Sequence, residues 1–124
     1  WYGTSISFIK DRLAAQHHII LDIDVQGAAQ ISSTSIPYVK IFIMPPSMRI
    51  LRERLIKRNT DSPREIEKRL LVARQEIKFI PQYDYLVIND ELSCAVKDVL
   101  AIIRGEENRT NRYPEPIKDF LEEE

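Results

Sequence analysis

The sequence is poor in glycine and cysteine, which excludes several kinds of site. Its 124 residues include three glycines, Gly3, Gly27 and Gly105. It therefore contains neither a G-x-x-x-x-G-K-[ST] loop nor a G-x-G-x-x-G fingerprint, the motifs that cradle phosphates. Its single cysteine, Cys94, excludes an internal disulfide and a zinc site of several cysteines. Cys94 falls on an apolar helical face, and we expect a small core residue there instead of a catalytic thiol.

Long apolar runs and an excess of one charge are also missing. The 18 lysines and arginines nearly balance the 19 aspartates and glutamates, so no global basic field favours nucleic acid. No apolar run approaches the roughly 18 residues that a membrane span needs, and we recognise no secretory signal. We therefore expect a protein of the reducing cytoplasm, with neither a nucleic acid nor a membrane as partner.

Apolar periodicity predicts helices that alternate with strands. The expected strands are the stretch 17–27, which ends before a turn at Gln26–Gly27, and the segments 39–44 and 83–89. The expected helices lie at 5–16, 25–34, 47–56, 63–79 and 91–104, with caps at Thr4 or Ser5, Ser47, Ser62 and Asp90 and a stop at Gly105. This order is typical of an α/β fold with a parallel sheet. Three strands are few for such a sheet, so the fold looks incomplete.

Two aspartates interrupt the apolar stretch 17–27. The stretch is apolar on both faces, which is typical of a buried strand in a parallel sheet. Side chains two positions apart share a direction, so Asp22 and Asp24 point the same way near the carboxyl end of that strand, where ligands bind in open α/β sheets. Because buried carboxylates need a cation or a donor, the pair indicates a metal-bound water, a donor-rich ligand or both. Helix capping or arginine pairing is the structural alternative.

Arginines crowd into the two helices around a break in the pattern at residues 57–62. Those expected to form a solvated face with ion pairs are Arg49, Arg52, Arg64 and Lys68. Arg69 instead borders the inward face of its helix, and Arg58 lies in the break. Arginine is the preferred planar donor to phosphate, so a mobile segment with several arginines is suited to clamp polyphosphate. This segment and the aspartates follow separate strands, and we expect them to face one cleft, as in a phosphoryl-transfer site.

Six segments together resemble guanylate kinases, in the order and spacing of that family, from residue 1 to about residue 104. They are Tyr2–Ser5, Leu21–Gly27, Ile43–Ser47, Arg54–Asp61, Glu67–Leu70 and Tyr83–Asp90. The resemblance implies a partial P-loop NTPase fold over residues 1–105, with a helical lid at about 47–79. It also implies transfer of the γ-phosphoryl group of ATP to GMP, with Mg²⁺ as cofactor. The polar extension 106–124 lies outside the resemblance, and we expect one helical turn there at 117–121.

The resemblance implies three residues that bind GMP. Tyr2 resembles the tyrosine that donates to the GMP phosphate, and Thr4 resembles the hydroxyl residue that contacts guanine. Asp24 resembles the carboxylate that reads the guanine edge. This last role is chemically sensible, because guanine presents N1–H and N2–H donors to a fixed acceptor and adenine does not.

The resemblance also implies residues around ATP and the transferred group. Asp22 resembles the acidic residue near Mg²⁺ and the phosphates, and is not expected to bind the metal directly. Arg58 and Arg69 resemble lid arginines that close on the transferring phosphoryl group. Arg54 resembles a weaker member of that set on the ATP side, and Asn89 resembles the residue near adenine. At Asn59 the family often has glycine, but asparagine also tolerates a left-handed backbone, so the lid turn is expected to survive.

The segment that would carry the first strand and the phosphate-binding loop is absent from the sequence, which opens on Trp1 without an initiator methionine. In this fold that strand lies inside the sheet, so its neighbours would flank a gap. We expect a piece of a longer kinase, inactive alone, from a monomer or homodimer. The alternatives are a guanylate-kinase-like module that binds proteins without catalysis, and an unrelated flavodoxin-like regulatory domain, which leaves the arginines unexplained.

Overall fold

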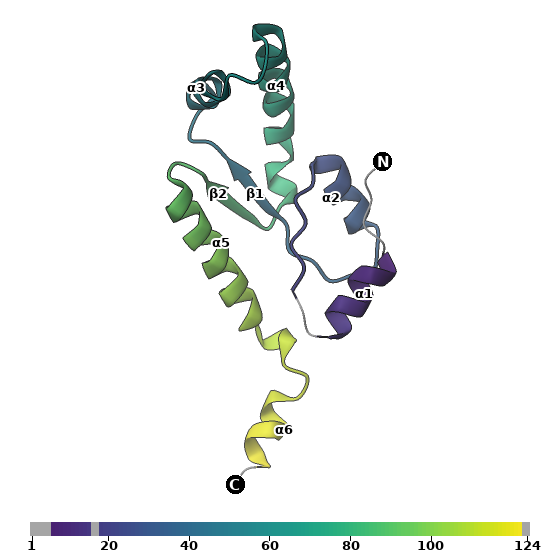
Figure 1. Cartoon of the computed structure of the whole chain (residues 1–124). Coiled ribbons are helices and arrows are strands. Elements are labelled where there is room, and N and C mark those ends of the chain that lie inside the picture. Colours follow the sequence, from purple (N-terminus) through teal and green to yellow (C-terminus); the bar gives the residue numbers. More distant parts are fainter. Residues whose placement is uncertain (1–5, 16–17, 123–124) are drawn as a thin grey trace.

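The computed structural model of the chain describes residues 6–15 and 18–122, apart from the side chain of Ile6. Helices surround a small parallel sheet (Figure 1). The α-helices and strands are α1 (Ile6–Ala14), α2 (Val25–Ser32), β1 (Ile41–Met44), α3 (Met48–Arg58), α4 (Pro63–Glu76), β2 (Tyr85–Ile88), α5 (Leu92–Glu107) and α6 (Pro116–Leu121). Two 3₁₀ turns, η1 (Ile77–Gln82) and η2 (Thr110–Arg112), complete the described part. The predicted order of helices around a parallel sheet is confirmed.

The sheet consists of β1 and β2, which pair in parallel from Ile41 opposite Tyr85 to Met44 opposite Ile88. Its best-covered side chain is Val87, which is 2% exposed. The connection between the strands runs through α3, α4 and η1, as a parallel pair requires a crossover. The predicted strands at 39–44 and 83–89 are therefore confirmed in shortened form.

The strand predicted in the stretch 17–27 is wrong within the described residues. Residues 18–24 are extended but belong to no sheet, and Ile20 and Ile23 are 78% and 45% exposed. Strand structure needs a neighbouring chain edge to receive its N–H and C=O groups, and no described strand is hydrogen-bonded to this segment. Figure 1 shows the segment rising in the same direction as β1 before it enters α2.

Helices α1 and α2 enclose the side of the molecule next to residues 18–24. Ile9 on α1 and Ala28 on α2 are buried, and both line an apolar cavity of about 180 Å³ beside β1. The predicted Thr4 or Ser5 cap of α1 and its predicted end at Gln16 lie outside the described residues. Helix α2 confirms the short helix expected at 25–34.

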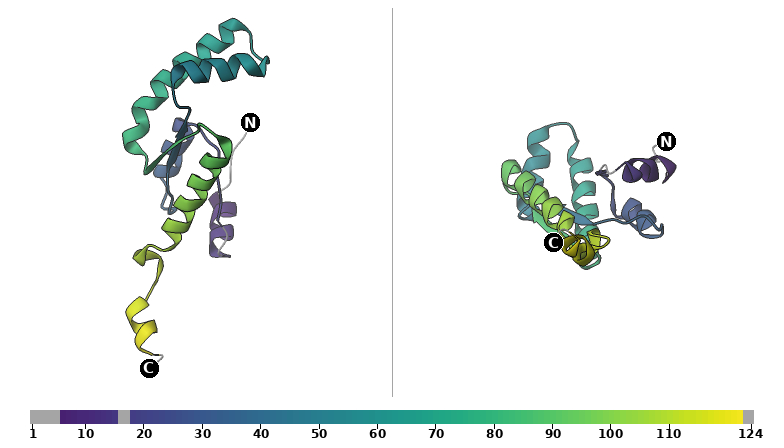
Figure 2. Two further views of the ribbon diagram at one scale, coloured as in Figure 1. Left: turned by 90° about the vertical axis from the view of Figure 1, so that its left-hand side faces the viewer. Right: turned by 90° about the horizontal axis from the view of Figure 1, so that it is seen from below.

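Helices α3 and α4 form a helical hairpin that projects from the carboxyl end of β1 (Figure 2). Each begins at a serine cap: Ser47 Oγ accepts from the Ile50 amide at 3.1 Å, and Ser62 Oγ accepts from the Glu65 amide at 3.2 Å. Its buried core consists of Leu55, Ile66 and Leu70, against which Met48 and Leu51 pack. We call residues 47–76 the arginine hairpin.

The turn of the hairpin begins in a left-handed conformation. Asn59 has φ 53° and ψ 30°, as expected of an asparagine that takes the place of glycine. At its other end α4 stops at Glu76, and η1 follows instead of the predicted helix to residue 79. Ile77, the first residue of η1, is 38% exposed.

Three predictions about α5 are wrong. Glu91, not Asp90, is the N-cap residue, and the Asp90 carbonyl accepts from Arg54 instead. Helix α5 continues through Gly105 to Glu107, and its last turn carries the Glu106 carboxylate that accepts from the Tyr85 hydroxyl. Cys94 is exposed instead of buried, since it stands beside the buried Ala95 on a face of α5 that no described element covers. The helical turn expected at 117–121 is confirmed as α6.

Candidate functional site

The carboxylate side of the candidate site lies where residues 18–24 meet α2. Asp24 is the N-cap residue of α2, and its Oδ1 accepts a hydrogen bond from the Gly27 amide at 2.8 Å. A Cβ at Gly27 would lie 3.1 Å from Cβ of Ile23 and 3.4 Å from Oδ1 of Asp24, so glycine permits this close cap. Helix capping, the structural alternative, is therefore confirmed for Asp24. Its Oδ2 accepts no hydrogen bond from the described residues.

Asp22 is exposed and engages no donor or cation among residues 6–15 and 18–122. The part of the chain that the structure describes also holds no group of three or more metal-ligating side chains. Tyr83 lies within electrostatic reach of Asp24: burial first, and then the charges of Glu76 and Asp24, raise the pKa of the Tyr83 phenol. The carboxylate side thus offers one free carboxylate and one free carboxylate oxygen.

The arginine hairpin carries two different kinds of arginine. Arg49 pairs with Glu53 at 2.9 Å and Arg52 pairs with Glu67, both on exposed surface, which confirms their predicted solvated role. The Arg52 guanidinium lowers the pKa of the Glu67 carboxyl, chiefly through their hydrogen bond. These pairs connect turns within α3 and between α3 and α4, so they support the hairpin without facing a ligand.

The predicted phosphate-binding arginines are held differently. Arg58 is exposed in the last turn of α3, with no carboxylate within ion-pair distance in the described part of the chain. Arg69 Nε lies 2.9 Å from Oδ2 of Asp61, whereas Nη1 and Nη2 meet no acceptor among the described residues. Among the described residues, Arg58 and the forked end of Arg69 are therefore unengaged, and the same holds for other hairpin cations such as Arg64 and Arg74.

Arg54 and Asn89 are brought together, but not by their predicted ligand contacts. Arg54 Nη1 donates to the Asn89 carbonyl at 2.6 Å, and Nη2 donates to the Asp90 carbonyl at 2.8 Å. The guanidinium thereby ties α3 to the turn between β2 and α5. Two donors in one plane fit two successive carbonyls, a geometry that lysine does not offer. The Asn89 side chain makes no hydrogen bond with the residues that the structure describes.

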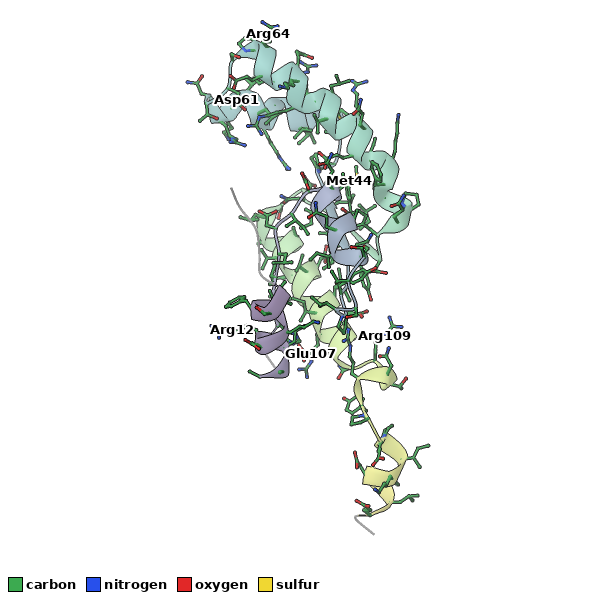
Figure 3. The ribbon with its side chains drawn as sticks, turned by 90° about the vertical axis from the view of Figure 1, so that its right-hand side faces the viewer. Arg12, Met44, Asp61, Arg64, Glu107 and Arg109 are labelled. Atoms are coloured by element: carbon green, nitrogen blue, oxygen red, sulfur yellow. The ribbon has the colours of Figure 1, made fainter. Side chains whose placement is uncertain are left out.

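Two further groups escaped the sequence reasoning. Asp61, whose side chain is 9% exposed, lies 2.9 Å from Nε of Arg69; its position in the turn between the two helices was the available signal. Tyr85 OH donates to Oε2 of Glu106 at 2.5 Å, which lowers the pKa of the Glu106 carboxyl. Figure 3 places Asp61 at the outer end of the hairpin, far from Arg109 at the end of α5. Tyr2 and Thr4 lie outside the described residues.

Comparison of the sequence with known proteins identifies the family of the chain. Residues 1–106 match the family profile described as guanylate kinase. The chain belongs to the guanylate kinase family. This is a P-loop NTPase family, and the chain contributes to it mixed helices and a small parallel sheet.

The chain is similar to curated proteins named guanylate kinase. It is 43% identical to that of Nitrosomonas europaea over 111 residues, which cover 90% of the chain and 55% of the relative. It is 40% identical to that of Methylobacillus flagellatus over 125 residues, covering 98% and 62%. It is 37% identical to that of Clostridioides difficile over 124 residues, covering 100% and 60%. The chain thus spans 55–62% of the length of these guanylate kinases. Within the described residues, no helix meets the length and apolarity that a membrane crossing requires.

Proposed function

We propose that this chain forms part of an enzyme that transfers the γ-phosphoryl group of ATP to GMP, giving ADP and GDP. The observation that carries the proposal is the arginine hairpin, which stands over the carboxyl end of β1 with Arg58 and the forked end of Arg69 unengaged (Figure 2). Phosphoryl transfer needs cations that stabilise the negative charge on the transferring group. The protein contributes mainly by positioning these cations, and contributes little covalent chemistry. We propose residues 47–79 as a lid that closes and excludes water.

The nucleotide contacts follow from the same proposal. Tyr2 and Thr4 bind GMP, and the free Oδ2 of Asp24 accepts from the guanine edge while Oδ1 caps α2. Asn89 lies near the adenine of ATP, on the turn that Arg54 holds in place. Arg54 then acts on the ATP side by fixing this turn. The extension 106–124 lies outside the catalytic domain.

The chain's residues fit an Mg²⁺ ion that is held mainly by the nucleotide. Mg²⁺ commonly keeps several waters and takes one or two carboxylates plus substrate phosphates. Asp22, exposed and free of described partners, fits the position of a carboxylate that contacts such a hydrated ion through water. When bound, the ion supplies positive charge against the phosphates. Arg58 and Arg69 supply further positive charge, and the planar geometry of their guanidinium groups orients the phosphoryl group.

The test is GMP-dependent release of ADP. Because the sequence has no phosphate-binding loop, we propose that turnover requires one from outside these residues. The sample is the chain joined, before Trp1, to the loop-bearing segment of the Nitrosomonas europaea guanylate kinase, with the 124-residue chain as control. We expect ADP release with ATP, Mg²⁺ and GMP, little with AMP, and none from the control. A folded but inactive chimera would favour the protein-binding module instead.

Asp24→Asn separates the two roles of that residue. Asparagine caps helices about as well as aspartate, so the free energy of unfolding should change by less than about 0.5 kcal/mol. The amide cannot accept from both guanine donors, and the preference of the chimera for GMP over AMP should fall by roughly 10-fold or more. Ratios of kcat/KM for the two nucleotides measure this. An unchanged ratio would contradict the proposed role of Asp24 in reading the base.

A further inference from the structure

Asp61 is more buried than the two hairpin carboxylates that pair with Arg49 and Arg52. Its side chain is 9% exposed, whereas Glu53 and Glu67, which pair with Arg49 and Arg52, are both 61% exposed. A buried carboxylate is costly unless a cation or donor meets it. Within the described part of the chain, the cation at ion-pair distance from Asp61 is Arg69. The pair is therefore placed to hold one guanidinium in a particular orientation.

The contact leaves the other end of the guanidinium available. Nε of Arg69 lies 2.9 Å from Oδ2 of Asp61, and Nη1 and Nη2 have no acceptor among the described residues. Paired Nη donors match two phosphate oxygens, which makes arginine a bidentate phosphate ligand. The Nε atom of this guanidinium lies beside one anion, and both Nη atoms are open. This arrangement is expected of an arginine that one anion orients toward a second anion.

The pair is close without being aligned. Oδ2 of Asp61 is buried and receives no aligned hydrogen bond from the described residues, although Nε is within 2.9 Å. Hydrogen bonds of active sites are often poorly aligned without substrate and tighten in the reactive complex. A small rotation of the guanidinium gives Asp61 its missing hydrogen bond. Such a rotation also fixes the plane in which the two Nη atoms lie.

We propose that Asp61 is a positioning residue, which orients the Arg69 guanidinium so that Nη1 and Nη2 meet the transferring phosphoryl group. This rests on the proposed function, and Asp61 itself touches no substrate. Its negative charge weakens the attraction of Arg69 for phosphate, so its contribution is orientation, not charge. Loss of the carboxylate is therefore expected to slow the chemical step without weakening nucleotide binding, since misplacement by about 1 Å can cost 10²-fold in rate.

The experiment measures kcat and KM of the active chimera with Asp61→Asn, which keeps the shape of the side chain and removes its charge. We expect kcat to fall by about 10- to 100-fold, while KM for ATP and for GMP stays within about 2-fold or decreases. Asp61→Glu, which restores a carboxylate, should recover part of kcat. In an Arg69→Ala background, Asp61→Asn should change kcat by less than about 2-fold, because the group that it orients is gone.

Glu67→Gln is the matched control, since it breaks the exposed Arg52–Glu67 pair of the same hairpin and leaves Arg69 alone. Its kcat should stay within about 2-fold of the parent. A merely structural role of Asp61 predicts something else: a raised KM, a lowered melting temperature and an equal loss in the Arg69→Ala background. That pattern, or an unchanged kcat, would overturn the assignment. An inactive parent chimera would overturn the proposed function first, which keeps the two failures distinguishable.

Discussion

The arginine hairpin buries an apolar core of its own, whereas residues 18–24 leave large apolar side chains exposed. In the hairpin, Leu70 is 3% exposed and serine caps begin both helices. In the segment 18–24, Ile20 is 78% exposed, and the polar contacts at its two ends are His18 Nε2, 3.3 Å from Oε1 of Glu107, and the Asp24 cap of α2. Both regions carry residues of the candidate site. They differ in where their structural partners lie along the sequence.

The two regions differ in how far apart in the sequence their contacting residues lie. The buried core and both serine caps of the hairpin join residues within 47–76, so these features are built from local sequence. An extended segment instead gains its stability from a neighbouring strand, and no described residues supply one to 18–24. The arginine side of the candidate site thus has a core of its own, whereas the carboxylate side is fixed at the Asp24 cap.

The largest effect is expected in the core of the hairpin. Leu70→Ala removes a buried side chain from the contacts with Leu55 and Ile66, and should cost about 2–5 kcal/mol in the free energy that protects α4 amides from hydrogen exchange. Ile20→Ala should change the stability of the chain by less than about 0.5 kcal/mol, because its side chain is already in water. Hydrogen exchange and urea denaturation measure both.

Leu71→Ala is the matched control for the hairpin, since Leu71 is the next residue of α4 and is 59% exposed. It should behave like Ile20→Ala. If Leu70→Ala and Leu71→Ala have equal effects, the hairpin has no core of its own. If Ile20→Ala costs as much as Leu70→Ala, residues 18–24 are packed in solution, and the contrast between the two regions disappears.

A smaller effect is expected at the turn of the hairpin. Asn59→Ala puts a Cβ without a compensating polar group into a left-handed conformation, which should cost about 1–2 kcal/mol. Asn59→Gly adopts that conformation freely and is expected to leave the hairpin as protected as the parent. Hydrogen exchange of α3 and α4 amides compares the variants. Equal protection in Asn59→Ala would show that the turn does not limit the stability of the hairpin.

The sequence predicts the hairpin well, for the same physical reason. Ser47, Ser62 and the spacing of Ile66 and Leu70 are local signals, and each is found where the pattern placed it. Asn59 also takes the backbone conformation expected of it. Caps and helical faces are properties of a few consecutive residues, so a single sequence contains them.

Other features depend on distant residues, which the sequence does not identify. The strand expected in 17–27 needed a neighbour, and Cys94 needed a cover for its face of α5; the described residues provide neither. Asp90 is not the N-cap residue of α5. Its carbonyl instead accepts a hydrogen bond from Arg54, which lies 36 positions away in the sequence. The site shows the same division: Asp24 has a local cap, but whether it reads a base depends on a ligand.

The smallest effect tests a contact between distant residues. Tyr85 on β2 donates to Glu106 near the end of α5, and Arg109 and Arg112 lie at 3.5 and 3.6 Å from the same carboxylate. The hydrogen bond lowers the pKa of Glu106, so this carboxylate stabilises the fold above its ordinary pKa of about 4.3. That stabilisation is lost as the pH falls through the lowered value in the folded chain.

Tyr85→Phe should therefore raise the pKa of Glu106 toward its ordinary value and reduce the loss of stability between about pH 4.3 and the lowered pKa of the parent. NMR titration of the Glu106 carboxyl carbon measures the first effect, and denaturation at several pH values measures the second. Tyr113→Phe is the control, because Tyr113 is 50% exposed and lies beyond this contact. If the pKa of Glu106 stays lowered in Tyr85→Phe, Arg109 and Arg112 are the groups that lower it. The contacts of residues 106–112 would then be as local in sequence as those of the hairpin.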